Sequence, residues 1–239
     1  MPRFFASEAP FENSINLYGD DARHIGRSLR MRLGDVITVC YDKIDYSCRI
    51  LKISDEVINL EVLEQSPSLE PNIELILYQA VPKLDKLELI VQKATELGAV
   101  KVVPVMTARC VSRPDAKQFA KKRERLERIA FEAAKQSGRG IIPEVMDIIS
   151  LDECINQMKE LDLGLMCYEK GGKPLNSFEY PEKGKIGVLI GSEGGFDEKE
   201  ADLCVSAGVS PVWLGARILR CETAPIAAIS IIMNLTGNM

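Results

Sequence analysis

From residue 73 onward, short apolar runs alternate with amphipathic helical stretches, and this alternation constrains the fold more than any other feature of the chain. The run IELILYQA (73–80) is continuous and apolar, as expected of a strand buried on both faces of a sheet. In 86–97 the apolar residues recur at helical spacing, and Gly98 follows as a helix terminator. The alternation predicts an α/β domain with a mostly parallel sheet and helices on both faces.

The same alternation continues to the C-terminus. Further strands are predicted at 100–105, 163–168, 185–190 and 211–214. Further helices are predicted at 116–136, 150–160, 197–207 and 224–236. The last of these is apolar on nearly every side, so it must be buried in the core or against a partner.

The first third of the chain has a different pattern. Runs rich in β-branched residues at 36–41, 46–53 and 57–63, separated by polar turns, predict a small antiparallel meander. The stretch EQSPSLEPN that follows contains two prolines and indicates a linker. We therefore expect a β-rich domain over 1–67, a linker at 68–72 and an α/β domain over 73–239.

Composition excludes several classes of protein. Of the 239 residues, 46% are hydrophobic and 27% charged, which is typical of a soluble globular chain. No apolar run reaches the roughly 18 residues of a membrane span, and the opening MPRFFASEAPFENS lacks the apolar core of a signal peptide. Seven cysteines without a C-x-x-C pair favour reduced thiols and a cytoplasmic location. With one histidine, His24, no metal site is expected.

The net charge of −5 conceals two basic segments. Residues 23–32 hold four arginines and no acid, and 113–139 hold nine lysines and arginines against four acids. Local basic faces on an acidic body are typical of proteins that bind a phosphate backbone. In a helix, Arg23, Arg27 and Arg30 lie on one stripe, whereas the second segment is equally well explained as a solvated helix face.

A glycine loop, GSEGG at 191–195, follows the predicted strand 185–190. It lacks the G-K-[ST] of a phosphate-binding P-loop and the G-x-G-x-x-G of a dinucleotide site. Glu193 would repel a pyrophosphate, so loop amides beside a carboxylate suit an uncharged or cationic ligand. The alternative is a tight strand-to-helix turn whose glycines permit positive φ, followed by a helix capped by Asp197 and Glu200.

A second glycine loop favours the ligand-binding interpretation. WLGARILRCETAPIAAISIIMNL (213–235) again places a glycine after a strand, then an arginine-rich turn and a helix with Pro225 in its first turn. Two such loops at the C-terminal ends of neighbouring strands form the crevice in which open α/β sheets bind ligands.

Five segments also carry a resemblance to a known family: PRFF, VQKATELG, ERIAFEAAKQSGR, IGSEGGF and LGARILRCETA. They resemble the RsmE family of 16S ribosomal RNA (uracil-N3)-methyltransferases, which belong to the SPOUT superfamily. The resemblance covers essentially the whole chain. It implies a SPOUT-type trefoil-knotted sheet over 73–239 and a PUA-like β-barrel RNA-binding domain over 1–67. Ser192 stands where the family usually has proline, and Cys221 where it has threonine.

The resemblance implies S-adenosylmethionine as the methyl donor, with its adenine enclosed by the two glycine loops. The residues expected to contact it are Leu189, Ile190, Gly191, Glu193, Gly194, Gly195, Leu214, Gly215, Ile218, Leu219, Arg220, Thr223 and Ala224. Because the sulfonium is already activated, the enzyme must mainly align the nucleophile, the methyl group and the leaving sulfur.

Catalysis requires that uracil N3 lose its proton, after which negative charge spreads onto the flanking carbonyl oxygens. We expect Arg220 to stabilise this charge and Glu222 to act as an orienting or basic carboxylate. A salt bridge that ties the loop together explains Glu222 equally well. Cys221 is not expected to be a nucleophile, since no histidine base lies near it in the sequence.

The expected substrate is 16S ribosomal RNA in the small ribosomal subunit, and the family also implies a homodimer. The residues expected to contact RNA are Arg3, Arg23, Arg27, Arg30, Arg109 and Arg139. Two alternatives stay open at this point. One is a non-catalytic ribosome-assembly factor that only binds RNA, and the other is a SPOUT methyltransferase that acts on transfer RNA or on a ribose 2′-oxygen.

Overall fold

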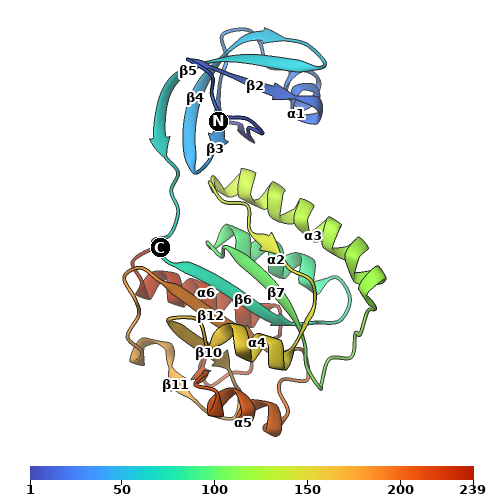
Figure 1. Ribbon diagram of the computed structural model, residues 1–239, viewed down its shortest axis with the longest axis vertical. Helices are drawn as coiled ribbons and strands as arrows, with labels where there is room; N and C mark the ends of the chain where they lie inside the picture. The colour runs from blue at the N-terminus through green and yellow to red at the C-terminus, as the bar shows by residue number, and fades with distance from the viewer. The chain divides into compact units, whose positions relative to one another are not determined.

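The computed structural model describes residues 1–239, which fold into two compact units (Figure 1). Unit 1 consists of Met1–Glu70 together with Ala134–Ile141, and unit 2 of Pro71–Ala133 and Ile142–Met239. The sequence pattern placed the change of domain in the same region of the chain but did not indicate that 134–141 belongs with the N-terminal residues. No helix combines the length and apolar character needed to cross a bilayer.

Unit 1 is built on one five-stranded sheet with strand order β1-β3-β4-β5-β2. The strands are β1 (Arg3–Phe5), β2 (Ser14–Tyr18), β3 (Val36–Tyr41), β4 (Ile44–Ile53) and β5 (Val57–Pro67). The predicted antiparallel meander is confirmed as β3, β4 and β5. The edge strands β1 and β2 were not predicted, because they are only three and five residues long, although Ile15 and Leu17 of β2 do alternate with polar neighbours. Residues that alternate along the meander, such as Ile37, Val39 and Leu60, are fully buried in the core of this unit.

The arginine-rich segment of unit 1 is not one continuous helix. α1 (Gly19–Arg23) runs into a single wide turn, η1 (His24–Ser28), and Arg30 has a φ of +53°. A residue in the left-handed region cannot continue a right-handed helix. The predicted stripe at i, i+4 and i+7 is therefore wrong for Arg30, although Arg23 and Arg27 both lie in helical turns.

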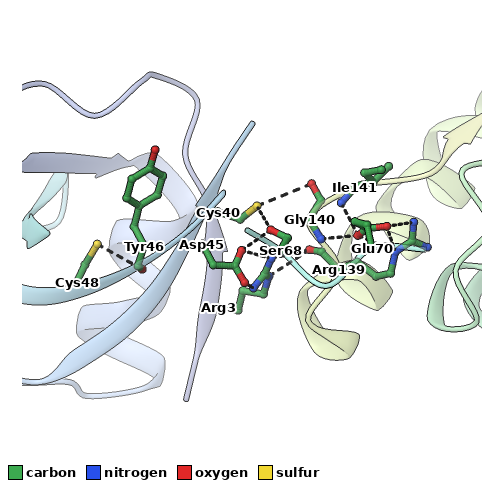
Figure 2. A network of polar contacts seen from close by, with 10 residues as sticks. All are labelled: Arg3, Cys40, Asp45, Tyr46, Cys48, Ser68, Glu70, Arg139, Gly140 and Ile141. Carbon is green, nitrogen blue, oxygen red and sulfur yellow. Dashed lines mark hydrogen bonds and ion pairs between the residues drawn. The ribbon is translucent and has the colours of Figure 1, made fainter. Parts of the chain in front are cut away.

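A network of polar contacts joins the two chain segments of unit 1, Met1–Glu70 and Ala134–Ile141 (Figure 2). The Glu70 carboxylate accepts hydrogen bonds from Arg139 Nε (2.9 Å) and from the backbone N–H groups of Gly140 (2.7 Å) and Ile141 (3.0 Å). Arg3 donates to both carboxylate oxygens of Asp45, at 2.5 and 2.7 Å, and to the carbonyl oxygen of Arg139. These contacts explain why 134–141 packs as part of unit 1.

Unit 2 contains an eight-stranded parallel sheet, as the alternation predicted. Its strands are β6 (Glu74–Ala80), β7 (Lys101–Met106), β8 (Glu144–Val145), β9 (Ile149–Ser150), β10 (Leu163–Cys167), β11 (Lys173–Pro174), β12 (Lys185–Ile190) and β13 (Ser210–Trp213). The order is β11-β13-β10-β12-β6-β7-β8, and β9 also pairs with β7. The two-residue strands β8, β9 and β11 were not predicted because so few residues carry no periodicity.

Helices cover both faces of this sheet. They are α2 (Lys86–Glu96), α3 (Ala116–Ser137), α4 (Leu151–Met158), α5 (Glu198–Ser206), α6 (Thr223–Leu235) and the 3₁₀ turn η2 (Leu175–Ser177). Leu75 and Leu77 of β6 pack in one core with α2, α3 and α6, whereas Ile76 and Tyr78 pack in the other with α4 and α5. Strand residues that alternate between two buried faces explain why the run 73–80 is apolar throughout.

Candidate functional site

A pocket of about 550 Å³ lies at the C-terminal ends of the unit 2 strands. Its walls come from the loop 191–195 after β12 and from 214–221 after β13, so the two glycine loops share one hollow as predicted. The prediction that β12 and β13 are neighbours is wrong, because β10 lies between them. The residues that follow β10, from Cys167 to Glu169, accordingly form a third wall. This volume is within the range of about 300–1,000 Å³ that is usual for small-molecule sites.

Most of the residues predicted to contact the cofactor line this pocket. They are Ile190, Gly191, Glu193, Gly194, Gly195, Leu214, Gly215, Ile218, Leu219, Arg220 and Ala224. Leu189 and Thr223 do not line it. Leu189 is fully buried in the core on the α4 and α5 side of the sheet, because successive strand residues point to opposite faces. Thr223 is the exposed first residue of α6.

Sequence reasoning missed several residues of the pocket. Among them are Lys86, Tyr168, Glu169 and Trp213. Lys86 and Glu169 could have been predicted, because ligands bind beyond the C-terminal ends of parallel strands. Lys86 follows β6 in the chain, and Glu169 follows β10. Trp213 is 43% exposed and is the only tryptophan of the chain, so its fluorescence reports on this pocket.

The glycines of the first loop are required by the packing of the chain itself. Gly195 has a φ of +65°, and a Cβ there would lie 2.6 Å from a carboxylate oxygen of Glu169. A Cβ on Gly191 would lie 3.1 Å from Gly195 Cα. The interpretation as a tight turn is thus correct for the loop's shape, and the same turn leaves its backbone along the pocket wall.

Arg109 braces the first loop from outside the pocket. Its guanidinium donates to the carbonyl oxygen of Gly194 at 2.9 Å and lies 3.7 Å from Asp197. Ser192, which replaces the family's proline, donates from its hydroxyl to the carbonyl oxygen of Arg109 at 3.3 Å. The helix that follows is capped as predicted, since the Asp197 N–H donates to Glu200 at 2.9 Å and Asp197 accepts from Lys199 N–H.

A charged cluster connects the two loops at the edge of the pocket. Lys86 Nζ lies 2.9 Å from Glu193 Oε1 and 3.1 Å from Glu222 Oε2. Glu193 also accepts a hydrogen bond from the backbone N–H of Lys83, at 3.1 Å. Glu193 is therefore an acceptor that closes its loop onto Lys83 and Lys86.

The protonation states of this cluster follow from its contacts. Desolvation opposes ionisation of Glu193, but hydrogen bonds from Lys86 and from backbone amides outweigh it and hold its pKa at about 2. The Glu222 pKa is likewise lowered, with desolvation outweighed by hydrogen bonds from its own backbone, Cys221 and Lys86. Hydrogen bonds to Glu193 and Glu222 raise the Lys86 pKa. At neutral pH the cluster thus contains one cation and two carboxylates.

The two residues that precede Glu222, Arg220 and Cys221, have contrasting surroundings. Cys221 is buried, and this burial, together with a hydrogen bond to Glu222 at 3.3 Å, raises the pKa of its thiol to about 12. Such a thiol is a poor nucleophile, in agreement with the expectation that Cys221 forms no covalent intermediate. Arg220 lines the pocket, is exposed, and its side chain makes no hydrogen bond or ion pair within the chain.

The arginines predicted to contact RNA fall into two groups. Arg23 pairs with Asp20 and Arg27 with Asp55, so the basic segment is balanced by acids outside it, although both arginines stay more than half exposed. Arg30 is exposed.

Arg3 and Arg139 belong to the second group, with side chains only 8% and 5% exposed. Their guanidinium groups are held by Asp45 and Glu70 in the network of Figure 2. A guanidinium that is buried and held by a carboxylate in this way is not available to an RNA phosphate, so we do not retain Arg3 and Arg139 as RNA contacts. Arg109, whose side chain is 39% exposed, stays a predicted RNA contact. The structure contains no group of three or more side chains that could hold a metal ion.

Two protein-family models match this chain and define the class of protein to which it belongs. Residues 69–233 match the RNA methyltransferase domain, and residues 17–63 match the RNA methyltransferase PUA domain. A PUA-type unit and a parallel-sheet unit with two glycine loops around one pocket define an RNA methyltransferase of the SPOUT type.

Individual relatives show which family within this class the chain belongs to. The chain is 36% identical over 234 residues to the Ribosomal RNA small subunit methyltransferase E of Bacillus subtilis, covering 94% of this chain and 90% of that protein. A crystal structure of the enzyme of that name from Neisseria gonorrhoeae, bound to S-adenosyl methionine, has a TM-score of 0.87 and 32% identity and covers 98% of both chains. A putative methyltransferase from Legionella pneumophila in complex with the same cofactor has a TM-score of 0.85 and 28% identity, covering 97% of this chain and 96% of that one. The chain belongs to the RsmE family.

Proposed function

We propose that this protein transfers a methyl group from S-adenosylmethionine to N3 of a uridine in 16S ribosomal RNA of the small ribosomal subunit. The observation that carries the proposal is the single pocket shared by the two glycine loops, in a chain similar over its whole length to enzymes of this kind.

The pocket fits the cofactor in shape and in charge. Backbone of both glycine loops and the side chains of Ile190, Leu214 and Leu219 provide a wall for a flat, neutral adenine. The cluster of Lys86, Glu193 and Glu222 carries a net negative charge at neutral pH, which suits a ligand with a sulfonium. When bound, S-adenosylmethionine supplies a methyl group that is already activated for transfer.

Arg220 has the properties required of the group that stabilises the uracil anion. It borders the pocket, and no carboxylate of the chain neutralises it. A fixed positive charge beside the carbonyl oxygens that flank N3 stabilises the uracil anion and so favours loss of the N3 proton to water. Glu222, in contrast, is held by Lys86, and a carboxylate with a lowered pKa is a weak base. We therefore assign Glu222 to holding the loop.

Unit 1 provides the remaining RNA contacts in this proposal. Arg23, Arg27 and Arg30 keep exposed side chains, and phosphate contacts of this kind contribute affinity without reading sequence.

The protein acts in the cytoplasm, as the reduced thiols of all seven cysteines favour.

We also propose a homodimer. Ile231 and Leu235 of α6 lie one turn apart, are 39% and 37% exposed, and present apolar surface on the side of the helix that faces away from the core. Light scattering on the purified protein tests this directly, with twice the monomer mass expected and the monomer mass contradicting it.

The experiment that tests the function is mass spectrometry of ribosomal RNA nucleosides from cells with and without this protein. Loss of 3-methyluridine from 16S RNA, and its return with the wild-type gene but not with Arg220→Ala, is the expected result. An unchanged nucleoside profile together with retained binding to the small subunit would favour a non-catalytic assembly factor. Loss of a transfer RNA or ribose methylation instead would change the substrate.

A further inference from the structure

We propose that Lys86 is a positioning residue, which holds the two glycine loops together through Glu193 and Glu222 and thereby sets the affinity of the pocket for S-adenosylmethionine. The inference rests on the proposed function for its ligand, but the tie itself is a property of the free protein.

The geometry of the cluster supports this role. Lys86 is the first residue of α2, on neither loop, and its ammonium group lies within 3.1 Å of carboxylate oxygens from both. Glu193 belongs to the loop after β12, and Glu222 ends the loop after β13 as the N-cap position of α6. Since β10 separates these two strands in the sheet, no backbone pairing connects the loops at this point, and Lys86 bridges them.

Each carboxylate is also fixed from a second direction. Glu193 accepts from the Lys83 N–H at 3.1 and 3.3 Å, and Glu222 accepts from the Cys221 thiol at 3.3 Å. Neither carboxylate can therefore move together with Lys86 unless it loses its hydrogen bond from the Lys83 N–H or from the Cys221 thiol. A cation held between two anchored anions has a defined position, which a mobile surface ion pair does not.

Lys86 has no donor left for a ligand. An ammonium group has three N–H bonds. Its neighbours in the structure are Glu193 at 2.9 Å, Glu222 at 3.1 Å and the Cys221 sulfur at 3.6 Å. Although the side chain borders the pocket, its hydrogen-bonding capacity is spent inside the cluster, so it acts through the loops and not by binding the cofactor.

Removing the charge has a second consequence. One carboxylate oxygen of Glu193 and one of Glu222 lie against Lys86 Nζ. Without the ammonium group, these two carboxylates face each other at the edge of the pocket. Their repulsion drives the loops apart, and the pocket loses the shape in which both walls contact one ligand.

The first test uses the free protein. Hydrogen exchange of Lys86→Met is compared with that of wild type and of Lys93→Met, which removes a lysine of the same helix from an ion pair with Glu96 outside the pocket. We expect faster exchange in both 191–196 and 214–222 for Lys86→Met and wild-type exchange for Lys93→Met. Unchanged exchange in both loops of Lys86→Met would overturn the inference.

The second test measures the ligand. Calorimetry should give a Kd for S-adenosylmethionine about tenfold higher in Lys86→Met. This is the size expected when a charge-assisted contact that holds the two loops together is lost. The KM for the cofactor rises in the same way while kcat at saturation changes less, and Lys86→Arg recovers most of the affinity. In the Lys86→Met background, Glu222→Gln should recover part of it by removing the repulsion.

The two proposals fail in different ways. If wild type itself binds no S-adenosylmethionine, the proposed function is wrong, and the exchange experiment still decides the tie. If wild type binds the cofactor and Lys86→Met binds it equally well, the function stands and the role of Lys86 is wrong.

Discussion

Two ion-pair clusters of this molecule use the same chemistry for different ends. In unit 1, Arg139 and Glu70 are 5% and 11% exposed, and Glu70 also accepts backbone N–H groups of Gly140 and Ile141. In unit 2, Lys86 is 26% exposed and borders the pocket. Buried charges that lose a partner are costly, whereas partly solvated ones are not. Burial therefore separates the charge pair that stabilises the fold from the one that shapes the site.

The largest expected effect tests the buried side of this comparison. Glu70→Ala removes the buried carboxylate that accepts from the Arg139 guanidinium and from two backbone N–H groups, which should cost about 3–5 kcal/mol of the stability of unit 1. Urea unfolding followed by far-UV circular dichroism should show an earlier transition. Trp213 fluorescence should report the unit 2 transition separately.

The matched control is Glu74→Ala, because Glu74 is 59% exposed and lies 3.8 Å from Lys185 in a solvated pair. Its change should stay within about 0.5 kcal/mol. Equal effects of the two substitutions would mean that burial is not what distinguishes the clusters.

Arg220→Ala tests the functional side of the comparison. Because Arg220 is exposed and unpaired, its loss should leave the unfolding transition unchanged while kcat falls by about 10²–10³-fold, the usual size for a lost electrostatic donor. Steady-state methylation of small subunits with labelled cofactor measures this. A loss of stability with normal kcat would reverse the assignment.

The pH dependence of cofactor affinity tests the unit 2 cluster of Lys86, Glu193 and Glu222. The folded pKa of Glu193, about 2, lies below its ordinary value of 4.5, so its contribution is complete above pH 4.5 and is lost as the pH falls toward 2. Cofactor affinity, followed by Trp213 fluorescence, should be constant from about pH 8 to about pH 5. In Lys86→Met the decline should begin at a higher pH. A wild-type titration centred near neutral pH would contradict this.

The smallest effect is expected at the exposed arginines. Arg27→Ala removes a side chain that is 66% exposed and paired only with Asp55. RNA affinity should fall modestly, and the slope of log K against log salt should decrease by roughly 0.7–0.9 if one phosphate contact is lost. Arg49→Ala, from the exposed pair with Glu61, is the control. Identical slopes for wild type and Arg27→Ala would remove Arg27 from the RNA surface.

Much of the fold was predictable because its signals are local. The run 73–80 and the periodic residues of 86–97 indicated β6 and α2 with bounds within one residue of those found. The loops after β12 and β13 were recognised from their glycines. Period and turn chemistry are properties of neighbouring residues, so a single sequence contains them.

What could not be predicted depends on contacts between distant residues. The order of strands in the sheet, which inserts β10 between β12 and β13, is not encoded in any local period. The same holds for Lys86, whose importance lies in Glu193 and Glu222 far along the chain. The neighbours of Arg139 in the sequence place it in a basic segment, but its environment is determined by Glu70.

Hydrogen exchange of the wild-type protein with and without S-adenosylmethionine tests the central claim, that two glycine loops jointly enclose the methyl donor. We expect saturating cofactor to slow exchange in both 191–195 and 214–221, and in the 168–169 segment after β10. Protection of only one loop, or of neither while the cofactor is bound, would contradict this claim.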